Sequence, residues 1–152
     1  MLGPENIKFN SINWLHNGGD IASQQLGWYF FSNDIWRFPL GSNPNYGTGL
    51  NNSIVYSDSI PFLALIFKLL KYFIPENFQY FSFWFTICFF AQLLFSYKIL
   101  FHLSKNNLGS IIGSFFFLFS PILFYRIGLH PSLAGHWLIL AAIYLALTKE
   151  LK

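Results

Sequence analysis

Two aspartates at either end of a polar, aromatic-rich segment are the first candidates for chemistry in this chain. Asp20 follows two glycines in NGGDIAS, and Asp58 lies in YSDSIP, shortly before a long apolar run. Two carboxylates on one surface can bind a divalent cation, or one can act as a base while the other stabilises charge. Each aspartate could instead be the N-cap of a helix, a position that Asp favours. The sequence leaves both interpretations open, and they are compatible.

The other polar candidates also have structural alternatives. Arg37 could pair with Asp34, three residues before it. Lys68 and Lys71 share a helix face and could reach lipid phosphates, or could simply extend their charge to water. His136 lies near the start of an apolar run, where it could be an interfacial residue or could contact a ligand or substrate on the outer face.

The composition indicates that most of the chain lies in lipid. The 152 residues are 54% hydrophobic, 22% aromatic and only 10% charged, whereas soluble domains have about 25% charged residues. The nine basic residues are scattered, with no run that would bind nucleic acid. Nucleotide-binding loops, the nucleophile elbow and the HExxH zinc motif do not occur in the sequence. The single cysteine, Cys88, cannot form an intramolecular disulfide.

The apolar runs predict an all-α, polytopic membrane protein fragment. Residues 1–59 form an extracytoplasmic loop with short helices, because they are too polar and too interrupted by Gly and Pro to span a bilayer. Residues 60–76 form a juxtamembrane interfacial helix, too short to span and closed by Pro75. About three transmembrane helices follow, over 78–103, 108–125 and 131–148.

The basic residues orient these spans. Lys98 and Lys105 flank the first connection between spans, and Lys149 and Lys152 follow the last apolar run. By the positive-inside rule, these positions are cytoplasmic, and the long loop and the connection at Arg126 are outside. Residues 1–16 contain no segment that would translocate this loop. We therefore expect the sequence to be part of a longer chain whose first helix and later portion are missing.

Four blocks of the chain resemble the bacterial DUF6311 membrane proteins. The blocks are NGGDIASQQLGWYFFSNDIWRFPLGSNPNYG, NSIVYSDSIPFLALIFKLL, NFQYFSFWFTICFF and GLHPSLAGHWLILAA. The resemblance covers nearly the whole chain, and members of the family are longer polytopic proteins. The family pattern often has a His where this chain has Gln24, so no role is assigned to that position.

The layout of that family is distantly similar to the GT-C membrane glycosyltransferases. This similarity implies an enzyme of the bacterial inner membrane that transfers sugar from a polyprenyl-phosphate donor on the extracytoplasmic side. Asp20 matches the early loop acid, which implies a role as base or as an acid near a metal. Asp58 matches the acid before the juxtamembrane helix, which implies contact with a metal or with the acceptor, and the implied cofactor is a divalent cation. The residues implied in substrate binding are Arg37, Lys68, Lys71, Arg126 and His136. The alternative is a non-catalytic membrane subunit or a lipid-handling protein of surface polysaccharide assembly.

Overall fold

The computed structural model describes residues 18–47, 51–76 and 78–149. The chain divides into two compact units, Met1–Ser82 and Phe83–Lys152. Within the described residues every regular element is a helix, and the only β-pairing is an isolated bridge between Ser42 and Ser53. The predicted all-α fold is therefore confirmed.

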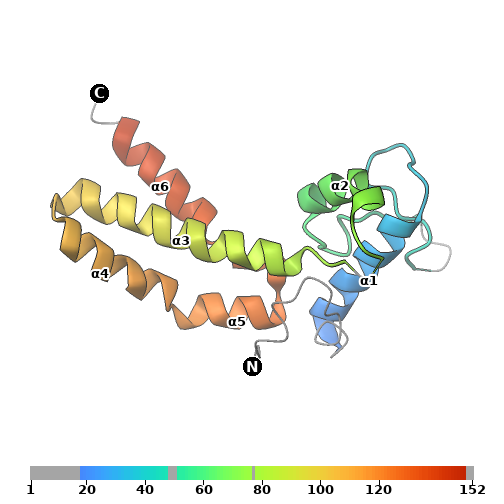
Figure 1. Cartoon of the computed structure of the whole chain (residues 1–152), viewed down its shortest axis with the longest axis horizontal. Helices are drawn as coiled ribbons and strands as arrows, with labels where there is room; N and C mark the ends of the chain where they lie inside the picture. The colour runs from blue at the N-terminus through green and yellow to red at the C-terminus, as the bar shows by residue number, and fades with distance from the viewer. Residues whose placement is uncertain (1–17, 48–50, 77, 150–152) are drawn as a thin grey trace. The chain divides into compact units, whose positions relative to one another are not determined.

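Helices α1 and α2 belong to the first unit and are connected by a long segment of chain (Figure 1). Helix α1 covers Gly19–Asn33 and α2 covers Pro61–Leu69, with a proline in its first turn as is usual for that position. A short 3₁₀ helix, η3, covers Lys71–Phe73. The segment predicted as one interfacial helix over 60–76 is therefore an α-helix followed by a single 3₁₀ turn. Residues 1–17, the start of the predicted loop, lie outside the described part of the chain.

Tyr80 is the centre of the aromatic core of the first unit. Its ring is fully buried, stacks on Phe67 of α2 at 5.6 Å, and meets Trp28 of α1 edge-on at 4.9 Å. The indole Nε1 of Trp28 donates to the carbonyl of Phe78 at 3.0 Å. The stretch just before the next helix is thus packed against both α1 and α2.

Among the described residues, the remaining helices supply three segments long and apolar enough to cross a membrane. Helix α3 covers Phe81–Ser104, beginning in the first unit and continuing through the second. In the second unit, α4 (Asn107–Leu118) and α5 (Pro121–Leu129) run back along α3 (Figure 1). The third segment consists of the 3₁₀ helix η4 (Pro131–Ala134) and α6 (Trp137–Lys149). This count confirms the predicted number of spans.

The second segment is broken, where the sequence predicted one continuous helix over 108–125. Pro121 has no N–H group, so the carbonyl of Phe117, four residues earlier, has no helical partner there. The backbone N–H of Ser120 donates to that carbonyl at 3.4 Å, and the Nε2 of Gln92 on α3 donates to it at 3.5 Å. The break is therefore stabilised from the neighbouring helix, as an interrupted helix in lipid requires.

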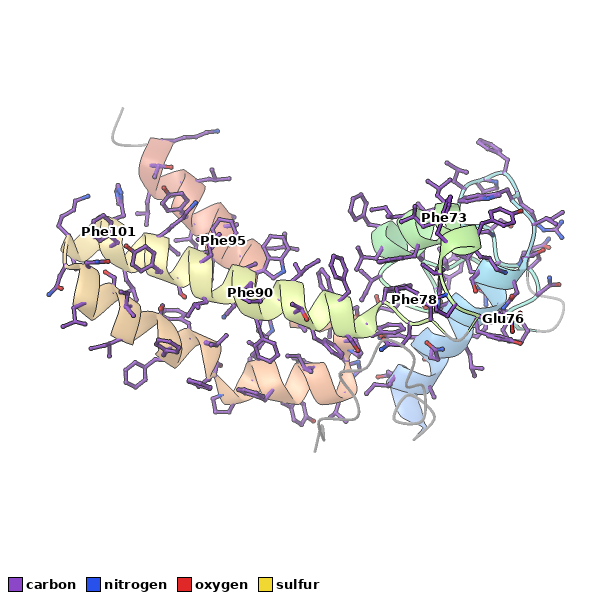
Figure 2. All side chains as sticks on the ribbon, viewed as in Figure 1. Phe73, Glu76, Phe78, Phe90, Phe95 and Phe101 are labelled. Atoms are coloured by element: carbon purple, nitrogen blue, oxygen red, sulfur yellow. The ribbon has the colours of Figure 1, made fainter. Side chains whose placement is uncertain are left out.

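Aromatic side chains hold α3 against its neighbours, and others remain exposed. Phe95 stacks on Trp137 of α6 at 6.1 Å, and the indole of Trp84 donates to the carbonyl of Pro131 at 2.7 Å. Phe90 on α3 and Phe116 on α4 are 71% and 77% exposed, and Figure 2 labels Phe90 and Phe95 on α3. Such exposed apolar surface is consistent with helices whose solvent is lipid.

Candidate functional site

Asp20 lies exposed in the first turn of α1. The N-cap of this helix is Gly18, with a φ of 88°, and it makes no side-chain capping hydrogen bond. The N-cap interpretation of Asp20 is therefore wrong. A carboxylate in the first turn is still favoured, because the N-terminal end of a helix carries a partial positive charge.

Asp58 is exposed and has a left-handed backbone, with a φ of 53°. The N-cap of α2 is Ile60, which is also left-handed, with a φ of 50°. Asp58 is therefore not the cap that the sequence suggested. A positive φ is tolerated by Asp but is a genuine outlier for a β-branched residue such as Ile. The segment from Asp58 to Ile60 thus has a strained backbone that the surrounding structure must hold.

Two buried serines on either side of Asp58 hold this segment against α1. The hydroxyls of Ser57 and Ser59 are hydrogen-bonded to each other at 2.7 Å, and Ser59 Oγ donates to the carbonyl of Gln24 at 2.7 Å. Tyr80 holds the same segment by donating its hydroxyl to the carbonyl of Ser59. Asp58 is therefore displayed from a fixed loop.

Gly27 makes the close approach of this loop to α1 possible. A Cβ atom at Gly27 would lie 2.1 Å from Ser57 Oγ and 2.6 Å from Ser59 Oγ, so any other residue would displace the loop. The hydrogen bond from Ser59 to Gln24 lies one helical turn after Asp20, about 6 Å along the axis. The structure thus brings the Asp58 loop to the N-terminal half of α1, where Asp20 also lies.

The two lysines of the α2 region bind the opposite end of α1. Lys71 Nζ donates to the carbonyl of Ser32 at 2.6 Å and to Asn33 Oδ1 at 2.8 Å. Lys68 Nζ donates to the carbonyl of Ile35 at 3.4 Å. Cations are favoured at a helix C-terminus, where carbonyl groups lack helical partners.

Lys68 is also enclosed by aromatic rings. Lys68 is only 5% exposed, and its Nζ lies 3.9 Å from the ring centroid of Phe31 and 4.8 Å from that of Trp36. Burial lowers the pKa of Lys68, and the nearby negative charge of Asp34 partly opposes this shift. We therefore replace the predicted contact of Lys68 and Lys71 with lipid phosphates by a contact with α1.

Arg37 and Asp34 form the ion pair that the sequence suggested. Arg37 Nε lies 3.3 Å from Asp34 Oδ2, and the Asp34 side chain is only 5% exposed. The hydrogen bond from Arg37 is the main cause of the lowered pKa of Asp34. This pair lies just beyond the C-terminal end of α1, about 21 Å along the axis from Asp20. Asp20 and the ion pair of Asp34 with Arg37 therefore belong to separate clusters of charged residues.

Arg126 and His136 belong to the second unit. Arg126 is half-buried in the last turn of α5, and His136 is half-buried between η4 and α6. Their predicted roles in substrate binding stay predictions. Within residues 18–47, 51–76 and 78–149, no three His, Cys, Asp or Glu side chains gather as a metal site.

The comparison with known protein families decides the identity of this chain. A family model described as domain of unknown function DUF6311 matches residues 1–152. The chain belongs to the DUF6311 family. No curated protein and no solved structure matches it.

Sequence reasoning missed the residues that support Asp58 in this DUF6311 chain. Ser57, Ser59, Gly27 and Tyr80 were not candidates, because each acts through a contact distant in sequence. The one local signal was the pair of serines flanking the acid in YSDSIP. Their small polar side chains can hydrogen-bond backbone groups in turns, which is how such residues fix a loop.

Proposed function

We propose that this DUF6311 chain is part of a GT-C-like glycosyltransferase of the bacterial inner membrane. The proposed reaction transfers a sugar from a polyprenyl-phosphate donor to an acceptor hydroxyl on the extracytoplasmic side. Asp58 is the proposed catalytic acid-base residue, and Asp20 is the second carboxylate of the same surface. The proposal rests on these residues and on the layout of the sequence.

The observation that carries the proposal is the way Asp58 is held. An exposed carboxylate in a left-handed backbone, beside a left-handed Ile60, costs free energy that two buried serines and Tyr80 offset. Strained backbone that is held by its surroundings clusters at active sites, where it fixes a reacting group in one position.

The proposed chemistry uses the carboxylate of Asp58 as a general base. It accepts the proton of the acceptor hydroxyl while the hydroxyl oxygen bonds to the anomeric carbon of the sugar. The bond between that carbon and the phosphate oxygen breaks, and its electron pair leaves with the polyprenyl phosphate. One bond to the anomeric carbon forms while another breaks, and the proton moves to Asp58. No oxidation or reduction takes place.

The negative charge on the departing phosphate needs a cation nearby. Arg37, which is 41% exposed beside Asp34, and Arg126 of the second unit remain the proposed substrate contacts, together with His136. Lys68 and Lys71 are assigned to the α1 contact instead. A divalent cation fits Asp20 and Asp58 only if the donor phosphates or water supply further ligands, because Mg²⁺ typically takes one or two carboxylates at such sites.

Replacement of each acid by its amide tests this function. In the full-length protein, Asp20→Asn and Asp58→Asn should each lower sugar transfer to membrane lipid or surface polymer by at least about 10²-fold. Immunoblotting should find both variants in the membrane at near wild-type levels. Glu76→Gln is the matched control, because Glu76 is an exposed acid with no role in the proposed site. Near-normal transfer in both Asn variants would contradict the proposal and favour the non-catalytic subunit.

The proposed location of the site has its own test. In a Cys88→Ser background of the full-length protein, a membrane-impermeant thiol reagent should label Asn45→Cys and Ser132→Cys in intact cells. The same reagent should label Asn106→Cys only after the membrane is opened, because the basic connection is expected to be cytoplasmic. The reverse pattern would put the acids on the cytoplasmic side and contradict an extracytoplasmic reaction.

A further inference from the structure

We infer that the outer face of α2 and η3 is a membrane-contact surface that binds the boundary between lipid headgroups and acyl chains without using anionic headgroups. This inference concerns how the first unit meets the bilayer and does not depend on the proposed enzyme activity. It is carried by the side chains on this face, by the direction of the two lysines, and by the contact of α2 with the residues just before α3.

The outer face is apolar along its whole length. Exposed side chains recur at helical spacing, so they form a single stripe of residues: Phe62, Ile66, Leu69, Leu70 and Phe73. Tyr72 beside the stripe is 97% exposed and Phe73 is 87% exposed; Phe73 is labelled in Figure 2. Exposed Phe and Tyr side chains at this density are typical of segments that lie in a membrane interface.

The charges of this segment are directed away from the stripe. Lys68 is buried over Phe31, and Lys71 Nζ is bonded to Ser32 and Asn33 of α1. The remaining charged residue between positions 61 and 76 is Glu76, which is exposed and which anionic headgroups would repel. An interfacial helix that bound anionic lipid would instead have lysines at its lipid-facing edge. The stripe is therefore suited to contact by apolar burial alone.

The contact of α2 with the residues that lead directly into α3 indicates lipid as the occupant. Phe67 of α2 packs its ring on Phe78 at 4.9 Å and on Tyr80 at 5.6 Å, and Tyr80 stacks on Phe81 at 4.9 Å. Phe81 is the first residue of a helix long and apolar enough to cross a membrane. The end of such a helix lies at the bilayer surface, so the ring contacts through Phe78 and Tyr80 hold α2 near that level.

Spin labels on the stripe test the inference in the full-length protein reconstituted into vesicles. Nitroxides would be attached to Leu69→Cys and Phe73→Cys in a Cys88→Ser background. Phe116→Cys on α4 would be the lipid reference, and Asn45→Cys in the loop would be the aqueous reference. Collisions with oxygen and with a water-soluble nickel chelate would be compared in phosphatidylcholine vesicles with and without phosphatidylglycerol.

The expected result is that both stripe labels collide more with oxygen than with the chelate, as the Phe116 label does. Their depth should be about 5–10 Å below the headgroups and equal in the two lipid mixtures. Chelate access like that of the Asn45 label would show that the stripe lies in water. Low access to both reagents would show that protein covers it. Burial only with phosphatidylglycerol would show that charge drives the contact. Each of these three outcomes would overturn the inference.

Discussion

Lys68 Nζ lies 3.9 Å from the centroid of the Phe31 ring, so a charge carried by α2 rests on an aromatic face of α1. Contacts of a cation with an aromatic ring are worth about 0.5–2 kcal/mol, with the larger values at sites shielded from water. Together with the bond from Lys71 to Ser32, this contact fixes α2 on the C-terminal end of α1. Both lysine side chains therefore extend toward α1.

Burial of Lys68 predicts that stability rises with pH in the alkaline range. The folded chain releases the Lys68 proton at a lower pH than the unfolded chain, whose lysine has its usual pKa of 10.5. Between these two values the unfolded state binds more protons, so the unfolding free energy increases with pH, by at most about 1.4 kcal/mol per unit. Lys68→Met should remove this slope in denaturation of the detergent-solubilised protein, followed by tryptophan fluorescence. An unchanged slope in Lys68→Met would contradict the assignment.

Loss of the Tyr80 hydroxyl should destabilise the first unit while leaving its ring packing in place. Tyr80→Phe keeps the stack on Phe67 but leaves the buried carbonyl of Ser59 without this donor. A buried polar group that loses its partner costs about 1–3 kcal/mol. Equilibrium denaturation should show a loss of this size, and Tyr72→Phe, at a position 97% exposed, should change nothing. Equal stability of the two variants would show that the Ser59 contact does not support the Asp58 loop.

A methyl group at Gly27 should displace the Asp58 loop. The new Cβ of Gly27→Ala would lie 2.1 Å from Ser57 Oγ, and relief of such a clash typically costs about 1–3 kcal/mol. We expect lower stability and lower transfer activity together. Gly128→Ala on α5 is the matched control, because its Cβ would meet nothing within 4 Å. That variant should be neutral or stabilised by up to about 1 kcal/mol. Full activity in Gly27→Ala would show that transfer does not depend on the position of the Asp58 loop.

Apolar length made the spans predictable, whereas local breaks were harder to place. The run around Cys88 predicted a helix over 78–103, and the structure has α3 at Phe81–Ser104. The break between α4 and α5 was signalled by Pro121, but the hydropathy of residues 108–125 is continuous and concealed it. Apolar composition reports burial in lipid, and the backbone break depends on the missing N–H of one proline.

The site was harder to predict because its contacts are tertiary. The spacing of Lys68 and Lys71 showed that they share a side of the helix, and both do bind α1. Spacing alone could not decide between lipid and protein, because the carbonyl groups at the end of α1 are distant in sequence. Asp20 and Asp58 have residue types that favour N-caps, but Gly18 and Ile60 occupy those positions. The left-handed backbone at Asp58 had no sequence signal beyond its tolerance by Asp.

Sugar transfer by Asp58→Gly in the full-length protein, measured beside its membrane abundance, tests whether the Asp58 carboxylate is the base. Glycine adopts a φ of 53° without strain, so this variant keeps the backbone conformation of the loop while removing the carboxylate. If the carboxylate is the base, transfer should fall at least about 10²-fold at normal abundance. Transfer near the wild-type rate would contradict the account, because it would show that the strained position requires only its backbone conformation and not its acid.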